Sequence, residues 1–147
     1  MKKKYRLGYT TGVFDLFHVG HLNLLEKAKE HCDFLIVGVS TDELVQSYKS
    51  KTPIIPFSER IRIVESIKFV DKVVPQTTRE KVEAFHKYKF DVMFVGDDWK
   101  GTSKWEKLEG DFSNLGVDIV YFPYTKGTSS TMLTEVLTKL TTTSTVK

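Results

Sequence analysis

The stretch TTGVFDLFHVGH, residues 10 to 21, connects an apolar segment to a segment with helical spacing. The apolar segment from Tyr5 to Thr10 predicts a strand. After the turn, apolar residues at positions 22, 25 and 28 predict a helix that runs through His31. A strand that passes through a short turn into a helix is the first half of a βαβ unit. This stretch therefore favours an α/β fold.

Strand and helix patterns keep alternating along the rest of the chain. The run FLIVGV, residues 34 to 39, is typical of a strand that is covered on both faces. Such alternation, joined by right-handed crossovers, predicts a Rossmann-like, doubly wound and mainly parallel five-stranded sheet. Residues 1–140 are expected to form this single domain, and the low-complexity tail at 141–147 is expected to be disordered. The other predicted segments are strands at 70–74, 91–95 and 117–122, a helix capped by Ser58, and helices at 79–88 and 129–140.

The composition of the chain argues against several classes of protein. Its 147 residues suit one domain, and a net charge of +3 without a long basic stripe predicts no nucleic-acid partner. The single cysteine, Cys32, rules out an internal disulfide and fits a reducing compartment. No signal-peptide pattern is present, and no segment approaches the roughly 20 apolar residues of a membrane span. We therefore expect a soluble, cytoplasmic protein with no membrane partner.

Ligands of doubly wound sheets bind outside the carboxyl ends of the strands, where the strand order reverses. This rule directs attention to the segments that follow the predicted strands. Phosphate-binding residue types gather in these segments. The segments are residues 11–21, 40–56, 96–104 and 123–130.

Two histidines open the first predicted helix. His18 and His21 are separated by three positions and therefore share one helical face. The free N–H groups and the dipole of a helix N-terminus favour an anion, and Gly12 and Gly20 allow the backbone to approach a phosphate closely. Two imidazoles at this place can donate hydrogen bonds to phosphoryl oxygens as charge develops in a transition state. The pattern predicts a site that polarises a triphosphate without a nucleophile of its own.

Three other interpretations of this segment remain open. The histidines can be ordinary surface or packing residues. A metal site can use His18, His21 and Asp15, although no further ligand has the expected spacing. The GxGxxG fingerprint of dinucleotide-binding enzymes is absent, which disfavours a redox enzyme.

The tetrapeptide HVGH, residues 18 to 21, is the HxGH signature of the HIGH-type nucleotidyltransferases. Its flank GVFDLFH, residues 12 to 18, resembles the cytidylyltransferase version of that signature. From about Tyr9 to Leu137 the chain is similar to the small bacterial glycerol-3-phosphate cytidylyltransferases. The resemblance implies the HIGH nucleotidyltransferase fold, a homodimer, and transfer of CMP from CTP to a small phosphorylated alcohol. Glycerol-3-phosphate is the expected acceptor, with CDP-glycerol and pyrophosphate as products and Mg²⁺ as the counter-ion of CTP.

Three basic residues occupy positions that the family uses for phosphates. Lys49 and Lys51 fall in the loop whose lysines close over triphosphate and acceptor, although loop lysines are usually only solvated. Arg60 occupies the place of the family's helix-opening arginine, and a guanidinium suits a bidentate phosphate clamp. The alternative is an exposed arginine on an amphipathic helix, which is our interpretation of Arg62.

The segment GDDWKG, residues 96 to 101, resembles the GDDW segment of the glycerol-3-phosphate enzymes. Asp97 and Asp98 can accept hydrogen bonds from an acceptor hydroxyl or a cytosine amine, and Trp99 offers an aromatic wall. The alternative is an aspartate pair that caps a turn, with Trp99 in the core. This segment is the main indication of the acceptor.

The segment TKGTSST, residues 125 to 131, resembles the RTEGISTT motif before the family's last helix. Hydroxyls and free N–H groups at a helix start can hold a phosphate, and helix capping alone also explains Ser129 and Ser130. The segment departs from the motif because Tyr124 replaces its arginine and Lys126 its glutamate. Lys126 restores a point charge but not a forked clamp.

The expected roles follow from these matches. His18, His21, Lys49 and Arg60 are expected to serve catalysis, and Lys49, Asp98 and Trp99 to hold the acceptor. The alternatives are another acceptor such as phosphocholine, phosphoethanolamine or a polyol phosphate, an adenylyltransferase that uses ATP, and a noncatalytic nucleotide-binding regulatory module. The nucleotide-binding residues are expected to be Thr10, Thr11, Gly12, Phe14, Asp15, Gly20, Lys51, Gly96, Asp97, Thr125, Gly127, Thr128, Ser129, Ser130 and Thr131.

Overall fold

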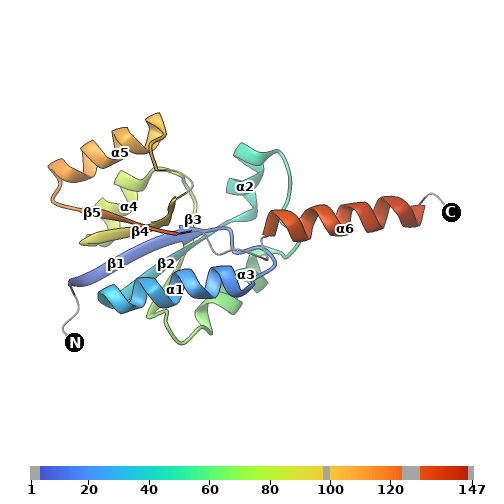
Figure 1. Cartoon of the computed structure of the whole chain (residues 1–147), viewed down its shortest axis with the longest axis horizontal. Coiled ribbons are helices and arrows are strands. Elements are labelled where there is room, and N and C mark those ends of the chain that lie inside the picture. Colours follow the sequence, from blue (N-terminus) through green and yellow to red (C-terminus); the bar gives the residue numbers. More distant parts are fainter. Residues whose placement is uncertain (1–3, 98–99, 124–129, 146–147) are drawn as a thin grey trace.

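A computed structural model describes residues 4–97, 100–123 and 130–145, with side chains described only for 133–140 in the last range. Strands and helices alternate along the chain, as the sequence predicts (Figure 1). The strands are β1 (Tyr5–Gly12), β2 (Cys32–Ser40), β3 (Lys72–Gln76), β4 (Val92–Gly96) and β5 (Asp118–Phe122). The helices are α1 (Val19–His31), α2 (Asp42–Lys49), α3 (Phe57–Glu65), α4 (Lys81–Tyr88), α5 (Ser103–Asn114) and α6 (Ser130–Thr145).

The strands form one sheet in the order β3-β2-β1-β4-β5, and every pair of neighbours is parallel. The long β1–β2 pairing, from Tyr5 opposite Cys32 to Gly12 opposite Val39, forms the centre of the sheet. The predicted Rossmann-like, doubly wound sheet of five strands is confirmed. Because β1 pairs with β2 on one side and β4 on the other, the strand order reverses at the end of β1.

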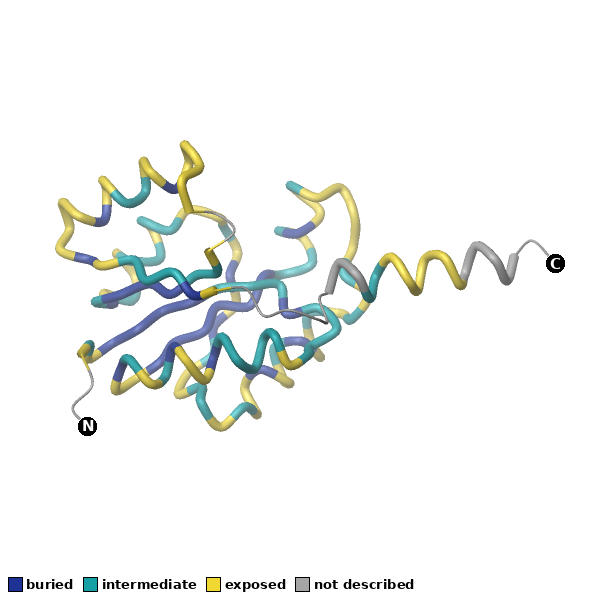
Figure 2. The backbone as a smooth tube through the Cα atoms, in the orientation of Figure 1, coloured by how far each residue is buried: buried dark blue, intermediate teal, exposed yellow. Residues whose placement is uncertain are grey.

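Helices cover both faces of the sheet (Figures 1 and 2). On one face, α1 and α3 pack over a core that includes Leu25, Val37 and Val64. On the other face, α4 and α5 pack over a second core, to which Tyr9 and Phe112 belong. Among the described residues, no helix has both the length and the apolar character that a membrane span requires.

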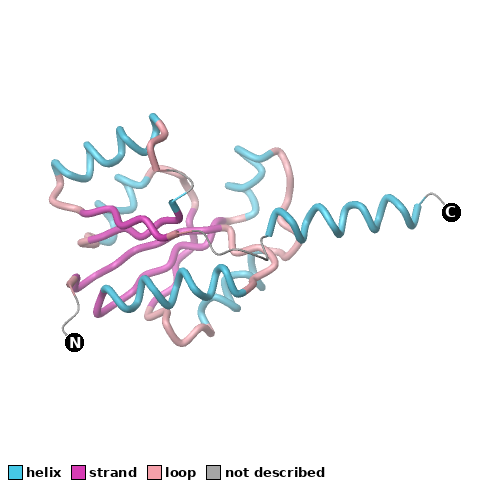
Figure 3. The backbone as a smooth tube through the Cα atoms, in the orientation of Figure 1, coloured by secondary structure: helices cyan, strands magenta, loops and turns pink. Residues whose placement is uncertain are grey.

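The structure corrects several predicted boundaries (Figure 3). Helices α2 and α5 were not predicted from the sequence; α2 is short and buries only Val45. Helix α3 begins at Phe57 after an N-cap at Pro56, so Ser58 is not its cap. The Phe57 N–H instead donates to Asp42 Oδ2 at 3.2 Å. Helix α6 continues past Leu140 to Thr145.

Candidate active site

The carboxyl ends of the strands face the turn between β1 and α1, the start of α2 and the start of α4. The turn holds Phe14 and Leu16 with φ values of 55° and 51°. Non-glycine residues in this left-handed region cost of order 1–3 kcal/mol each and persist only where the surroundings impose them. The turn at the end of β1 is therefore held in a defined and strained shape.

The two histidines form a capping box at the start of α1. His18 is the N-cap residue, and its Nδ1 accepts a hydrogen bond from the Gly20 N–H at 3.0 Å. His21 Nδ1 accepts from the His18 N–H at 3.2 Å, and the two ring centroids lie 4.0 Å apart. Because both Nδ1 atoms accept, each neutral ring carries its proton on Nε2. The capping box thus leaves two Nε2–H donors at the start of the helix.

Both imidazoles are held in the neutral form. Burial lowers the pKa of His18 below its usual range. Burial and the nearby His18 together lower the pKa of His21 to about 4, against an opposing effect of Asp15. Near neutral pH the pair therefore acts as two neutral hydrogen-bond donors.

The low pKa of His21 predicts a pH dependence of stability. The folded chain keeps His21 neutral down to pH about 4, whereas an unfolded chain protonates it below about 6.5. The unfolded state binds more protons between these values, so the free energy of unfolding falls as the pH drops from about 6.5 to about 4. Urea unfolding from pH 4.5 to 8 should show a smaller loss in His21→Asn, which keeps an acceptor for the His18 N–H. Parallel curves for the two proteins would contradict the assignment.

Gly12 and Phe14 shape the turn around the histidines. A Cβ atom on Gly12 would lie 2.9 Å from the Phe14 ring, which explains the glycine without a phosphate. Phe14 is 4% exposed, and its ring contacts His21 edge-on with centroids 5.4 Å apart. The Phe14 side chain therefore supports His21 from the core, and the predicted nucleotide contact of Phe14, by backbone or side chain, stays a prediction.

Thr10 and Thr11 differ in burial: Thr10 is buried, whereas Thr11 is accessible. Thr10 is 1% exposed, and its hydroxyl donates to the Phe94 carbonyl at 2.9 Å, so its side chain belongs to the core. The predicted nucleotide contact of Thr10, by backbone or side chain, stays a prediction. Thr11 is partly exposed, and its hydroxyl accepts from Lys81 Nζ at 3.2 Å. Of the two hydroxyls, only that of Thr11 faces a cavity.

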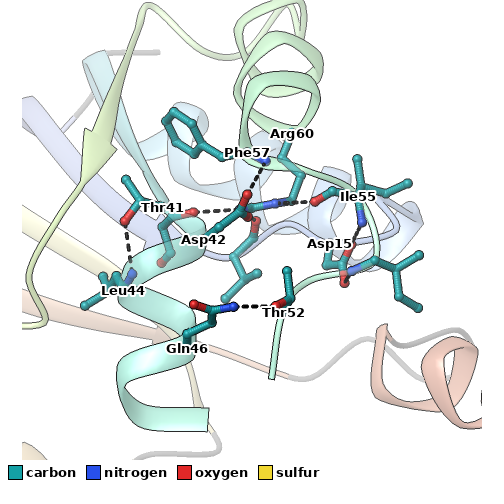
Figure 4. A network of polar contacts seen from close by, with 12 residues as sticks. Asp15, Thr41, Asp42, Leu44, Gln46, Thr52, Ile55, Phe57 and Arg60 are labelled. Carbon is teal, nitrogen blue, oxygen red and sulfur yellow. Dashed lines mark hydrogen bonds and ion pairs between the residues drawn. The ribbon is translucent and has the colours of Figure 1, made fainter. Parts of the chain in front are cut away.

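Asp15 fastens the loop that follows α2 (Figure 4). Its Oδ2 accepts from the Ile54 N–H at 2.8 Å and its Oδ1 from the Ile55 N–H at 2.9 Å. This contact joins the loop carrying Lys51 to the turn before His18. The structure thus gives Asp15, predicted to bind nucleotide, a role in positioning the loop.

Arg60 lies in the interior, where it holds three segments together (Figure 4). The residue is 0% exposed. Its guanidinium donates to the carbonyls of Ile55 (2.8 Å), Val13 (2.7 Å) and Ser40 (2.7 Å). It also pairs with Asp42 Oδ1 at 2.6 Å. These bonds occupy the fork that a phosphate clamp would need, so the predicted phosphate contact of Arg60 does not fit this structure.

Lys49 and Lys51 lie on either side of the end of α2. Lys49 is the last residue of the helix, Lys51 lies in the loop that follows, and both residues are exposed. Burial lowers the pKa of Lys49, and the nearby charge of Lys51 lowers it further, while Asp15 opposes the shift. An anion between these ammonium groups would relieve their repulsion.

A cavity of about 480 Å³ opens beside Thr11 and Gly12 on the α4/α5 face of the sheet. We call it the basic cavity, because five basic residues line it against two acidic ones. Four of these, Arg79, Lys81, Lys104 and Lys107, were not predicted as site residues from the sequence. Arg79 and Lys81 follow β3, so the rule that ligands bind at strand ends should have pointed to them. The charged lining residues are Lys49, Arg79, Lys81, Lys104 and Lys107, with Glu80 and Asp111.

The other predicted site residues are only partly covered by the structure. Gly96 ends β4, and Asp97 directly after it is exposed. Within the described residues, no cluster of three or more His, Cys, Asp or Glu side chains could hold a metal ion. Ser130 and Thr131 start α6, but their side chains are outside the described part. The predicted residues Asp98, Trp99, Thr125, Gly127, Thr128 and Ser129 lie outside the described residues, as do Tyr124 and Lys126.

Comparisons with known proteins agree with this geometry. The glycerol-3-phosphate cytidylyltransferase of Bacillus spizizenii is 39% identical over 132 residues, covering 89% of this chain and 96% of that protein. The FAD synthase of Pyrococcus abyssi is 38% identical over 114 residues, covering 77% of each chain. The crystal structure of a lipopolysaccharide core biosynthesis protein from Thermoplasma volcanium matches with a TM-score of 0.69 at 25% identity, covering 84% of this chain and 99% of that one. A model of the cytidylyltransferase-like family matches residues 9–146, a range that includes the paired histidines and the basic cavity. The chain therefore belongs to the cytidylyltransferase-like family.

Proposed function

We propose that the protein transfers CMP from CTP to glycerol-3-phosphate, giving CDP-glycerol and pyrophosphate. The observation that carries this proposal is the pair of neutral Nε2–H donors at the start of α1, where the strand order reverses. The identity to glycerol-3-phosphate cytidylyltransferases, 39% and 36% in two bacterial relatives, supports the choice of nucleotide and acceptor. The basic cavity, which Thr11 and Gly12 of the turn before the pair line, suits the negatively charged acceptor.

The proposed reaction is an in-line displacement at phosphorus. An oxygen of the acceptor phosphate attacks the α-phosphorus of CTP, and the bond from that phosphorus to the bridging oxygen of pyrophosphate breaks. The acceptor phosphate is already ionised near neutral pH, so the step needs no strong general base. The chain then contributes positioning and stabilisation of charge.

The described residues have three roles in the proposed reaction. His18 and His21 donate from Nε2 to the phosphoryl oxygens as negative charge builds on them. Lys49 and Lys51 neutralise the triphosphate chain. Asp15 and Arg60 act as positioning residues, because they fasten the lysine loop to the histidine turn. We retain nucleotide contacts by Gly20, Gly96, Asp97 and residues 125–131, and acceptor contacts by Asp98 and Trp99, as proposals.

We also propose a counter-ion, a domain organisation, an oligomeric state and a location for the protein. Mg²⁺ arrives with CTP as its counter-ion, because triphosphates are handled in enzymes as their magnesium complexes. A single domain, a homodimer and a cytoplasmic location are proposals that rest on the family resemblance and on the single, buried Cys32.

The experiment is an assay of pyrophosphate release with Mg²⁺ and either CTP or ATP. The acceptor panel holds glycerol-3-phosphate, phosphocholine, phosphoethanolamine and other polyol phosphates. We expect turnover with CTP and glycerol-3-phosphate. Turnover only with another acceptor or with ATP would overturn that part of the proposal, and CTP binding without turnover would indicate a regulatory module.

Tyr124 supplies a separate test of the regulatory alternative. In the family an arginine occupies its position and clamps a phosphate. If the wild-type site is complete, Tyr124→Arg should change kcat/KM by less than about tenfold, the size of one modest phosphate contact. A much larger rise in pyrophosphate release would show that the wild-type protein has lost part of its catalytic machinery.

A further inference from the structure

The floor of the basic cavity holds a row of polar side chains on three neighbouring strands. Thr11 of β1, Ser40 of β2 and Gln76 of β3 all line the cavity, each at or next to the carboxyl end of its strand. Side chains alternate between the two faces of a sheet, so Gln76 shares its face with Val74, which belongs to the core under α4 and α5. The Gln76 side chain therefore points to the side of the sheet on which the cavity lies.

Gln76 is a buried amide with one end bonded and the other end open. The residue is 8% exposed, and its Oε1 accepts from the Ser40 hydroxyl at 2.8 Å. Its Nε2 has no hydrogen-bond partner in the part of the chain that the structure describes. In that same part, no side-chain nitrogen or oxygen is both sealed from solvent and unbonded, so this Nε2 reaches open space. The open space that Gln76 lines is the cavity, which leaves a donor at its floor for a ligand.

The hydroxyls beside Gln76 already have partners. The Thr11 hydroxyl accepts from Lys81 Nζ at 3.2 Å, and the Ser40 hydroxyl donates to Gln76. The backbone of Gln76 is fixed as well, because it lies opposite Ser40 in the sheet and its carbonyl accepts from the Thr41 N–H at 3.1 Å. A donor that is held in place before a ligand arrives loses little conformational freedom on binding.

A neutral donor at this place matches a hydroxyl oxygen. The basic side chains that line the cavity are the stronger partners for a phosphate, because charge-assisted hydrogen bonds are about twice as strong as neutral ones. The uncharged Gln76 amide then suits the uncharged end of the same ligand. The cavity volume of about 480 Å³ falls within the usual range for small-ligand sites, roughly 300–1,000 Å³. A ligand that covers the amide without pairing it loses affinity, so such a donor also rejects ligands.

We infer that Gln76 is a specificity-determining residue that donates from Nε2 to a hydroxyl group of the acceptor. This inference rests on the proposed function and names the part of the acceptor that is recognised, a hydroxyl of the polyol and not its phosphate. Glycerol-3-phosphate pairs the amide. Propyl phosphate has no hydroxyl, and the quaternary ammonium group of phosphocholine accepts no hydrogen bond, so both leave Nε2 unpaired.

The test compares glycerol-3-phosphate with propyl phosphate, which has the same three carbons and phosphate but no hydroxyl. For the wild type, kcat/KM should be about 10- to 100-fold lower with propyl phosphate, because a buried donor is left unpaired. Gln76→Met keeps the length of the side chain and removes the amide. It should lower kcat/KM for glycerol-3-phosphate by about 3- to 10-fold, the effect of one neutral hydrogen bond. The value for propyl phosphate should not fall, and the KM for CTP should stay within about twofold.

Two further variants separate recognition from folding. Gln76→Met leaves the buried Ser40 hydroxyl without its acceptor, whereas Ser40→Ala/Gln76→Met removes both partners and should unfold in urea much like the wild type. The double variant should show the same preference between the two acceptors as Gln76→Met. Thr77→Val is the matched control, at the exposed position next along the chain, and should leave the preference unchanged.

Three outcomes would overturn the inference. An equal fall in kcat/KM for both acceptors in Gln76→Met would indicate a contact with the phosphate or a structural role. A rise in the KM for CTP alone would place Gln76 against the nucleotide. Unchanged kinetics with both acceptors and with CTP would show that the amide takes no part in binding.

Calorimetric binding of glycerol-3-phosphate, in the presence of the α,β-methylene analogue of CTP, separates this inference from the proposed function. Binding that Gln76→Met weakens, without turnover of CTP by the wild type, would refute the proposed function and uphold the inference. Turnover by the wild type, with binding that Gln76→Met leaves unaffected, would do the opposite. Absence of both turnover and binding in the wild type would contradict both.

Discussion

His18→Asn is expected to lower kcat by about 10²–10³, the usual cost of losing one preorganised donor to a developing oxyanion. Asparagine keeps a side-chain oxygen that can accept from the Gly20 N–H, so the helix cap survives. The Nε2–H donor is lost. Pyrophosphate release under saturating substrates measures the effect on kcat.

His18→Ala separates the cap from the chemistry. It should lose the same factor in kcat as His18→Asn, and about 1 kcal/mol of unfolding free energy besides, because the N-cap acceptor is also removed. Urea unfolding of the two variants measures that difference. A kcat of His18→Asn within about threefold of the wild type would contradict the donor role of the pair, since one lost donor should cost far more.

Arg60→Met is expected to reduce the free energy of unfolding by about 3–5 kcal/mol, the typical cost of breaking a buried ion pair. The change leaves Asp42 without its cation and three backbone carbonyls without their donor. Arg62→Met is the matched control, because Arg62 lies on the same helix and is exposed. Urea unfolding should place that control within about 0.5 kcal/mol of the wild type.

The same pair of variants tests the phosphate-clamp interpretation of Arg60. If Arg60→Met keeps wild-type stability but raises the KM for CTP strongly, the residue contacts phosphate and the buried network is not its main role. A double variant Asp42→Leu/Arg60→Met should recover part of the lost stability, because no charge is then left unpaired in the interior. Recovery of stability without recovery of activity would agree with a positioning role.

The fold was predictable because its signals are local. The continuous apolar run of β2 and the strand-to-helix change after β1 reflect burial on both faces of the sheet. Helix α2 was missed although its start is signalled locally, because Thr41 caps it by accepting from the Leu44 N–H. The helix is short and buries only Val45, so it has little apolar surface to mark it in the sequence. The prediction that Ser58 caps α3 was wrong for a similar reason. The Phe57 N–H at the start of α3 donates to Asp42, a residue of another helix that the local sequence does not show.

The site was predictable in part. The histidine pair could be found because its spacing and its place before a helix are visible in the chain. Burial decides between equivalent residues, and no local pattern separates the interior Arg60 from the exposed Arg62 or Thr10 from Thr11. Lys81 was missed because it reaches the basic cavity next to Thr11, a residue that lies far from it along the chain.

The fate of the α-phosphorus of CTP tests the central claim most directly. The protein is incubated with Mg²⁺, glycerol-3-phosphate and CTP that carries a radioactive α-phosphorus, and the products are separated. We predict that the label appears in CDP-glycerol, with one unlabelled pyrophosphate released for each molecule formed. Label that stays in CTP, or that appears in free CMP without CDP-glycerol, would contradict it.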